Sequence, residues 1–539
     1  MEKIKKFIDN YYSKIVVVST TIVCILAFLL CYISSIAVTS DLTITSDIAP
    51  YQFKDYPILH ILLLPLILIF ITKLYDKKIS EKRIKYLMID VCLLVSLLMM
   101  IFGGFLFADP SYSIYTARAI AGNHKYDSFL ISYPASYPYQ STYIWFLTLF
   151  AKPFGYFDFY ALKIAEVVMY FFSLTYIKKI FKSFFEKEYS WLIDVSLILF
   201  IPLWLTSEFA YDDIPGLLFV VLGIYTYQNK DSKLSFAISA ILTGLGIAIR
   251  NNYLILLIAF CIVMFADKKK LRIILFFALT ILTYKGISYV SYAGLKMLCP
   301  EIVNLEQNYP ITRWLYIGLS ESETGAGYWD ITTALGEESR ILLMERLQYF
   351  MKEIPQTLRF FAIKLANAYT SPDYDALDGF RHKDTTFFNL SLFKGFLYDR
   401  NIGYQIVLLV FNFFQSLIYA GNALFLLLDR NRNIKKYFGL IYFTGIFLFY
   451  IPWEIKARYV IVAVLFVIPT AVLGFYYLSR RKFTKKQLIL IGIVAVVAVA
   501  AAYALRQFLV MDTLNQTKLN DLQNAMDTEF IKMINSTKE

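Results

Sequence analysis

The chain has 539 residues, of which 58% are hydrophobic, 18% aromatic and only 17% charged, and its formal net charge is +12. Soluble domains carry about 25% charged residues, and a globular core cannot absorb this much apolar surface, whereas lipid can. Apolar runs of about 17–25 residues recur, which is the length that a helix needs to cross a bilayer. The composition excludes an ordinary soluble protein and predicts an all-α polytopic membrane protein.

The apolar runs predict about thirteen membrane-spanning helices. The first run follows a polar, basic start and is long enough to span, so it is interpreted as a retained span and not as a cleaved signal. In chain order the predicted spans are 15–37, 58–75, 85–107, 158–177, 190–206, 214–228, 233–249, 252–266, 272–290, 402–428, 437–452, 457–478 and 486–506.

Lysine and arginine concentrate in some of the connecting segments, and this bias predicts the orientation. These basic segments are 73–85, 178–187, 268–272, 430–436 and 480–486. Because short cytoplasmic loops are rich in Lys and Arg, we place the N-terminus in the cytoplasm and the C-terminus outside a multi-pass cell membrane. The net charge then reflects topology, and no basic patch with interleaved aromatic residues indicates a nucleic-acid partner.

The apolar run 137–150 is too short for a standard crossing and is flanked by Pro134, Pro138 and Pro153. If it crossed the bilayer, the basic segment 178–187 would lie outside, against the charge bias. We therefore predict an interfacial helix on the outer face, with a short crossing as the alternative.

These assignments divide the chain into a membrane bundle and one large outer loop. The loop is polar and contains helical runs at 337–350 and 357–368, so we expect a mainly helical extracytoplasmic domain. The predicted parts are an N-terminal cytoplasmic segment with two additional spans (1–84), a transmembrane core (85–290) with a first outer loop (108–157), the extracytoplasmic domain (291–401), C-terminal spans (402–506) and a polar extracytoplasmic tail (507–539).

On this topology, charged and aromatic residues collect at the outer ends of the spans. Charges at the membrane edge are costly, so each one is a functional hypothesis. The groups are Asp109 with the Tyr- and Pro-rich stretch to Gln140, Tyr211-Asp212-Asp213, Arg250-Asn251-Asn252, and Trp453-Glu454 with Lys456, Arg458 and Tyr459.

Carboxylates and cations that face one another at a membrane surface suit a lipid-phosphate-sugar donor. A phosphate leaving group needs cations to stabilise its developing charge. An incoming hydroxyl needs a carboxylate to accept its proton. The apolar tail of such a donor reaches the site sideways from the bilayer.

The ordered set of these motifs resembles a known family. Its members are Asp109-Pro110 followed by Tyr115, Ala119, Gly122 and Tyr133-Pro134; Tyr211-Asp212-Asp213; Pro310–Asp330 with Arg313 and Trp314, then Arg346 and Lys364; and Trp453-Glu454 with Arg458-Tyr459. The sequence resembles the GT-C superfamily of polytopic glycosyltransferases, in the bacterial branch similar to protein O-mannosyltransferases and lipid A aminoarabinose transferases. The resemblance covers about residues 85–480 and implies a GT-C-like bundle.

The resemblance implies an inverting transfer from a polyprenyl-phosphate-linked sugar to an envelope glycan, teichoic acid or glycoprotein. The implied catalytic residues are Asp109, as the base, with Asp212 or Asp213 assisting. The implied donor-phosphate ligands are Arg250, Lys456, Arg458 and Tyr459, and the implied substrate-binding residues are Tyr133, Gln140, Arg313, Trp314 and Glu454. Members differ in whether they need a divalent cation, Mg²⁺ or Mn²⁺, and nothing in the sequence decides this.

The sequence departs from the family pattern in two respects. The family's acid usually follows the first span, whereas Asp109 follows the third, so an acid of the loop 39–57 (Asp41, Asp47 or Asp55) is the alternative base. That loop lacks the Tyr…Ala…Gly pattern and the proline-flanked helix, so we prefer Asp109. A second acid often follows the first in the family, but here Pro110 does.

Each of these residues also has a simpler interpretation. Asp109 could cap a helix end, and Asp212 could be the N-cap of the following span. Arg250 could be a snorkelling anchor. Glu454 and Arg458 could form an i,i+4 helical pair. Trp314 and Trp453 could belong to an interfacial aromatic belt.

A different functional class remains open as well. An envelope polysaccharide polymerase or ligase would also have about twelve spans and a large outer loop, but we would expect outer Arg and His groups, and the chain has only three histidines. A lipid-linked saccharide flippase would carry charges inside several spans. Most of these spans are apolar inside, with Lys163, Glu166 and Lys285 as exceptions.

Overall fold

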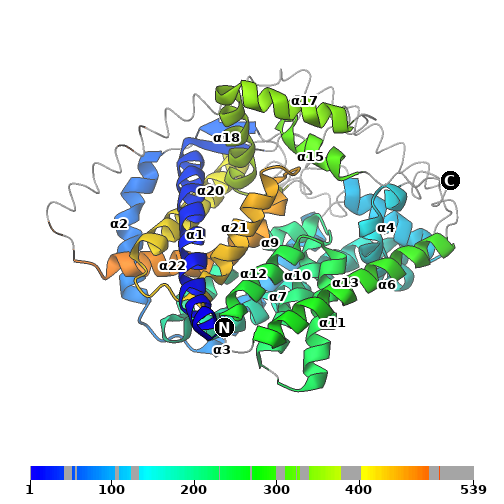
Figure 1. Ribbon diagram of the computed structural model, residues 1–539, viewed down its shortest axis with the longest axis horizontal. Coiled ribbons are helices and arrows are strands. Elements are labelled where there is room, and N and C mark those ends of the chain that lie inside the picture. Colours follow the sequence, from blue (N-terminus) through cyan, green and yellow to red (C-terminus); the bar gives the residue numbers. More distant parts are fainter. Residues whose placement is uncertain are drawn as a thin grey trace.

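The computed structural model describes residues 2–41, 51–54, 57–102, 108–122, 133–229, 231–266, 270–298, 310–322, 325–327, 339–377 and 402–482, together with 484, 497 and 500. This part of the chain is almost entirely helical (Figure 1), which confirms the all-α prediction. The exceptions are two short antiparallel pairs, β1 (Val38–Asp41) with β2 (Tyr51–Lys54) and β3 (Glu321–Ser322) with β4 (Gly325–Ala326).

Helices occupy the predicted spans as far as the structure describes them. In chain order they are α1 (Glu2–Ala37), α2 (Pro57–Leu74), α3 (Glu81–Phe102), α4 (Ala108–Ile120), α6 (Ser141–Phe154), α7 (Asp158–Phe185), α8 (Trp191–Ile198), α9 (Ile201–Leu205), α10 (Asp213–Asn229), α11 (Lys233–Ile249), α12 (Tyr253–Phe265), α13 (Lys270–Leu298), α15 (Ile311–Leu319), α17 (Ser339–Lys352), α18 (Ile354–Thr370), α20 (Ile402–Leu428), α21 (Phe438–Tyr450) and α22 (Ile461–Ser479).

Six helices in the described part of the chain are long and apolar enough to cross a membrane, and a bent pair makes up to seven. Five lie within α1, α3, α13, α20 and α22, and the sixth covers α7 and the turn that follows it, to Glu188. This supports a membrane protein with several spans. The predicted count of about thirteen and the orientation remain predictions. The last predicted span (486–506) is described only at isolated positions, and the tail (507–539) lies outside the described residues.

The bent pair is the predicted span 190–206, which is not one straight helix. The chain forms α8 and α9, whose axes differ by 41°. Pro202 lies in the first turn of α9, and a proline disfavours helical backbone in the residue before it and cannot donate a helical hydrogen bond. The break turns the chain toward the Tyr211–Asp213 segment.

Glycines allow the helices of the bundle to pack closely. A Cβ at Gly246 of α11 would lie 2.6 Å from the carbonyl oxygen of Gly216 in α10. A Cβ at Gly474 of α22 would collide with the Gly421 carbonyl of α20. Membrane helices commonly use small residues in this way to bring their backbones together.

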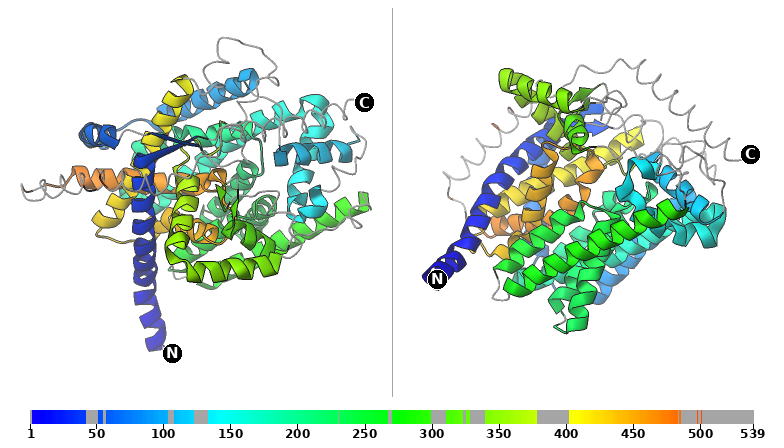
Figure 2. Two further views of the ribbon diagram at one scale, coloured as in Figure 1. Left: turned by 90° about the horizontal axis from the view of Figure 1, so that it is seen from above. Right: turned by 45° about the vertical axis from the view of Figure 1, so that its right-hand side comes forward.

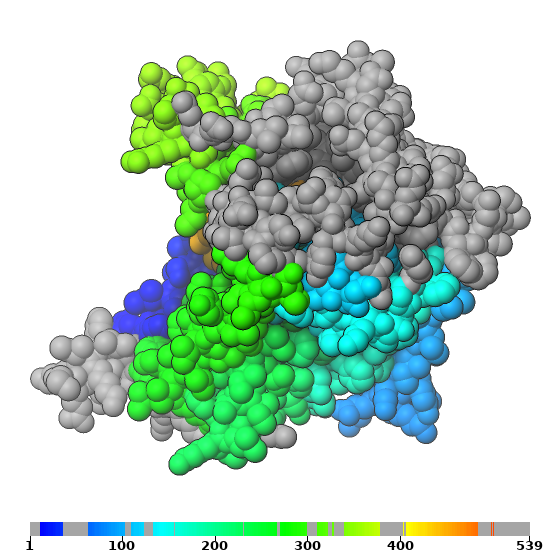
Figure 3. Space-filling model, turned by 90° about the vertical axis from the view of Figure 1, so that its right-hand side faces the viewer, coloured from blue at the N-terminus to red at the C-terminus, as the bar shows by residue number. Residues whose placement is uncertain are grey.

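The helices α15, α17 and α18 form a cap at one end of the bundle, and the N-terminus lies at the opposite end (Figures 1 and 2). Helices α17 and α18 confirm the helical runs predicted at 337–350 and 357–368. Phe360, Ile363 and Ala366 of α18 pack with Ala326 in a small core of their own. Helix α6 overlaps most of the predicted interfacial run, and its 14 residues extend about 21 Å, less than a hydrocarbon core of about 30 Å. Figure 3 shows the α4–α7 region (cyan) beside the α11–α13 region (green).

Candidate functional site

Arg250 forms a buried double ion pair with the two adjacent aspartates. Its Nη1 lies 2.8 Å from Asp212 Oδ1 and its Nη2 lies 3.0 Å from Asp213 Oδ1. The side chains of Arg250 and Asp212 are only 10% and 2% exposed. The arginine is therefore held in a buried network, and it is not a snorkelling anchor at the lipid surface.

Local structure explains how the two segments meet. Helix α11 ends at Ile249, and Arg250 has extended backbone with φ of −136°. A Cβ at Gly216 of α10 would lie 2.9 Å from Arg250 Cβ, so only a glycine lets α10 begin so close to the end of α11. The Tyr253 hydroxyl donates a hydrogen bond to the Asp213 carbonyl, 2.5 Å away, which ties the start of α12 to the start of α10.

Two of the predicted substrate-binding residues join this network. Gln140 Nε2 donates to the Tyr211 hydroxyl at 2.6 Å and to Asp212 Oδ2 at 3.3 Å. The hydroxyls of Tyr133 and Tyr211 are 3.3 Å apart. Asp212 thus receives hydrogen bonds from two different side chains. Burial, opposed by the Arg250 guanidinium, raises the pKa of Asp212 to about 7.

Asp109 and Arg458 form the second ion pair of the site. Asp109 lies in the first turn of α4, where a carboxylate is favoured by the helix dipole, and its side chain is 39% exposed. Arg458 Nη2 lies 3.6 Å from Asp109 Oδ2, as expected if these groups share one site. The Arg458 guanidinium rests over Phe209 at 4.2 Å and Tyr211 at 5.3 Å from the ring centres. These aromatic faces hold a cation that is almost buried.

The two ion pairs belong to one cluster, because Tyr211 and Tyr459 contact both arginines. The Arg250 guanidinium lies 5.6 Å from the Tyr211 ring centre and 5.2 Å from that of Tyr459, which also stacks on Tyr450 at 5.7 Å. Glu454 and Lys456, in the same loop as Arg458, are buried. Residues 454–456 are not helical, so the i,i+4 helical interpretation of Glu454 and Arg458 is wrong.

Arg313 and Trp314, the predicted residues of the outer cap, lie on α15. This helix packs on the loop 451–460, called the Arg458 loop below. Trp314 is stacked on Trp453 with ring centres 6.4 Å apart and lies 6.2 Å from Tyr137. Arg313 is partly buried on the same helix. Lys364 of α18 fastens this contact because its Nζ donates to the carbonyls of Gly318, Ile451 and Trp453 at 2.5, 2.8 and 2.8 Å.

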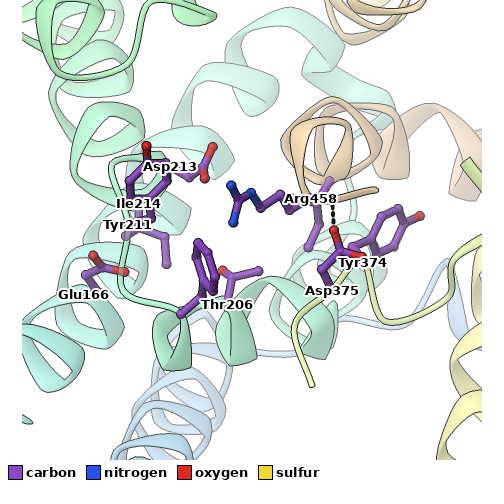
Figure 4. Close-up of a pocket in the computed structure, with 10 residues that line it drawn as sticks. Glu166, Thr206, Tyr211, Asp213, Ile214, Tyr374, Asp375 and Arg458 are labelled. Atoms are coloured by element: carbon purple, nitrogen blue, oxygen red, sulfur yellow. Dashed lines mark hydrogen bonds between the residues drawn. The ribbon is translucent and has the colours of Figure 1, made fainter. Parts of the chain in front are cut away.

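A small pocket lies beside Arg458, Tyr211 and Asp213 of the cluster (Figure 4), and sequence reasoning missed several of its other residues. Asp375 faces Arg458 from one side, and Asp213 and Glu166 line the other side. The pair of close acids in Ser371-Pro-Asp-Tyr-Asp375 was the available signal. Two buried ion pairs involve α7: Lys163 with Glu208, at 2.7 Å, and Asp158 with Arg118, at 2.5 Å.

The described acids do not fit a bound divalent cation well. Among the residues that the structure describes, no group of three or more His, Cys, Asp or Glu side chains could hold a metal ion. Asp212 and Asp213 instead form ion pairs with the Arg250 guanidinium. Of the alternative acids, Asp41 ends β1, and Asp47 and Asp55 lie outside the described residues.

Comparison with known proteins found no similar family: no family model, no curated protein and no solved structure matches this chain.

Proposed function

We propose that this protein is an inverting GT-C-like glycosyltransferase that moves a sugar from a polyprenyl-phosphate donor to an envelope glycan, teichoic acid or glycoprotein. The observation that carries the proposal is one partly exposed carboxylate, Asp109, beside a nearly buried guanidinium, Arg458. The other acids predicted to be catalytic, Asp212 and Asp213, are bound to Arg250. Among the described acids of the cluster, Asp109 is thus the most exposed one with an ion-paired guanidinium beside it.

In this proposal Asp109 is the general base. Its side chain is 39% exposed, so an acceptor hydroxyl can reach it. The acceptor oxygen bonds to the anomeric carbon as the carbon–oxygen bond to the phosphate breaks. The proton passes to Asp109, and the electron pair leaves with the polyprenyl phosphate. Base and leaving group lie on opposite faces of the sugar ring, which inverts the anomeric centre.

The cations of the cluster would stabilise the departing phosphate. Arg458 lies closest to Asp109, and its guanidinium is fixed by ring faces and not by solvent. A preorganised charge of this kind needs no reorganisation when the leaving group develops its negative charge. Arg250 and Lys456 are the further candidates. Asp212 and Asp213 then act by orienting Arg250, and not as bases.

The acceptor would approach from the cap side. Tyr137, Trp314 and Trp453 form a chain of ring contacts between the α6 end of the site and the cap, beside the Arg458 loop. Rings with polar tips suit an amphipathic substrate. We propose with this that the cap end of the bundle is extracytoplasmic, that the N-terminus is cytoplasmic and that about thirteen helices cross the membrane. The position of the N-terminus at the end opposite the cap supports this orientation.

The test is D109N in the purified full chain, reconstituted in lipid nanodiscs with a labelled polyprenyl-phosphate sugar. Loss of a general base lowers kcat by about 10²–10⁴-fold. E345Q, which changes an exposed carboxylate on α17, is the matched control and should leave transfer unchanged. In expressing cells, the mass of the envelope glycan should fall by one sugar for D109N alone.

Two results would argue for a different protein. Full glycosylation by D109N with loss in D41N would move the base to the first loop. Translocation of a labelled lipid-linked saccharide across vesicles without any sugar transfer would favour the flippase. The buried pair Lys163–Glu208 is the observation that keeps this rival open, because it places charge inside the bundle.

A further inference from the structure

The segment 371–377, which follows α18, leaves the cap and enters the bundle beside the cluster. Ser371, Asp373 and Tyr374 are completely buried, and Asp375 is 5% exposed. Gln415 of α20 donates to the Ser371 carbonyl at 2.9 Å, and the Ala376 amide donates to the Asp373 carbonyl at 2.9 Å, closing a turn. None of the roles proposed above uses this segment.

The backbone of this segment is strained at two consecutive positions. Tyr374 has φ of 53° and Asp375 has φ of 64°, in the left-handed region that residues with a Cβ rarely adopt. Such conformations persist only where the surrounding structure enforces them, and they gather at functional sites.

The strained turn presents the Asp375 carboxylate to the main chain of the Arg458 loop. The Arg458 backbone amide donates a hydrogen bond to Asp375 Oδ2 at 3.2 Å, and Figure 4 shows this contact. Arg458 belongs to the single turn Ala457–Tyr459, whose only other described backbone bonds join neighbouring residues. Asp375 therefore fixes the main chain, while the guanidinium of the same residue faces Asp109.

Asp375 and Asp213 line the same pocket and lie at opposite ends of the Arg458 side chain. Asp375 lies at the backbone end, and Asp213 lies on the side toward which the guanidinium points (Figure 4). A shift of the turn would move the guanidinium along the faces of Phe209 and Tyr211 and change its distance from Asp109. The backbone anchor therefore contributes to where the guanidinium lies.

We propose that Asp375 is a positioning residue, which anchors the Arg458 turn so that the guanidinium stands beside Asp109 where a phosphate is to be bound. This inference rests on the proposed function for the identity of that phosphate, and on geometry alone for the anchoring. It also means that the cap contributes directly to the membrane site, through the loop that follows its last helix.

Two substitutions at position 375 separate the effect of the carboxylate from that of the loop's conformation. D375G removes the carboxylate and relieves the backbone strain, because glycine adopts positive φ without cost, so the turn is not prevented from folding. D375N keeps an acceptor oxygen and also tolerates this conformation. S371A is the control for a general disturbance, because it removes only the hydrogen bond from Ser371 Oγ to Asp373 in the same loop.

The experiment measures how fast phenylglyoxal modifies Arg458 in the full chain in nanodiscs, by peptide mass spectrometry. Arg250, fixed by two aspartates, is the internal reference. We expect D375G to accelerate modification of Arg458 by on the order of ten-fold, the population change that the loss of one hydrogen bond allows. D375N and S371A should behave like the wild type, and the Arg250 rate should not change.

A rate for D375G within about two-fold of the wild type would overturn the anchoring role, since a lost anchor must release the turn. Equal acceleration in S371A would also overturn it, because the effect would then belong to the loop as a whole. Protection of wild-type Arg458 by polyprenyl phosphate tests the proposed function separately. Without such protection, acceleration by D375G still supports the anchor while the phosphate role fails. In transfer assays D375G should raise the donor KM, and D375N should restore it.

Discussion

Substitution of Arg250 by methionine should strongly destabilise the protein. The guanidinium contacts Asp212 at 2.8 Å and Asp213 at 3.0 Å, and none of the three side chains is more than 18% exposed. Solvent screening is therefore weak, and R250M leaves two carboxylates in the bundle without their cation. Removing one member of a buried ion pair costs about 3–5 kcal/mol, chiefly as the desolvation of the charge left behind.

The destabilisation should depend on pH. Burial raises the pKa of Asp212 to about 7 even with Arg250 present, and losing the cation raises it further. A carboxyl whose pKa is raised in the folded state contributes stability that is complete below its ordinary pKa and is lost as the pH rises. The deficit of R250M should therefore grow by up to about 1.4 kcal/mol for each pH unit above the ordinary aspartate pKa.

The assay is unfolding by SDS in mixed micelles, followed at pH 6 and pH 8 (about one unit on either side of the Asp212 pKa). The double variant D212N/R250M should recover at least about 1 kcal/mol relative to R250M, because one stranded charge is gone. R480M is the control, since its pair with Asp76 is about half exposed and should be worth less than about 1 kcal/mol. Equal stability of R250M and D212N/R250M would refute the reasoning.

Three further predictions concern the supports of the site. K364M should cost at least about 2 kcal/mol in the same SDS titration, because one buried and two partly buried carbonyls lose their donor. The exposed K352M should cost nothing measurable, and an equal loss in both would contradict this. G246A should destabilise the protein by about 1–3 kcal/mol and lower transfer, because its Cβ would lie 2.6 Å from the Gly216 carbonyl where α10 and α11 cross near Arg250. At Gly286 an added Cβ meets nothing within 4 Å, so G286A should be neutral. A tolerated G246A would argue against close packing of α10 and α11. Burial and the neighbouring Asp373 raise the pKa of Asp375 to about 7, so its contribution to stability is complete at low pH and is lost as the pH rises through about 7. D375N should flatten this part of the pH dependence of the thermal midpoint, and an unchanged profile would show that Asp375 does not titrate there.

The helices and the ends of the helices follow from local sequence. An apolar run of sufficient length forms a helix wherever the chain contains one, because lipid and core both require the backbone to satisfy its own hydrogen bonds. Placing the spans also placed Asp109, Tyr211–Asp213, Arg250 and the Arg458 loop at one end of the bundle. Their placement at the same end was therefore within reach of sequence reasoning, whereas their contacts at 2.8–3.6 Å were not.

Other features depend on which surfaces pack together, and no local pattern carries that information. The 41° break between α8 and α9 depends on one proline whose effect a hydropathy window averages away. Lys163 and Glu208 are 45 residues apart, and only the packing of α7 against the turn after α9 pairs them. The exposure of the acids was likewise decided by packing, since the Asp109 side chain is 39% exposed while that of Asp212 is 2% exposed.

Asp375 shows most clearly what the sequence indicates and what only the tertiary structure decides. Its motif is visible in the sequence, but the residue lies 83 positions from Arg458, in a loop assigned to the outer domain. It reaches the membrane site only because Tyr374 and Asp375 adopt left-handed backbone that the surrounding bundle enforces. Local sequence determined the helices, since their hydrogen bonds lie within each segment. Tertiary structure decided the site, since its contacts join segments whose approach depends on the packing of the whole chain.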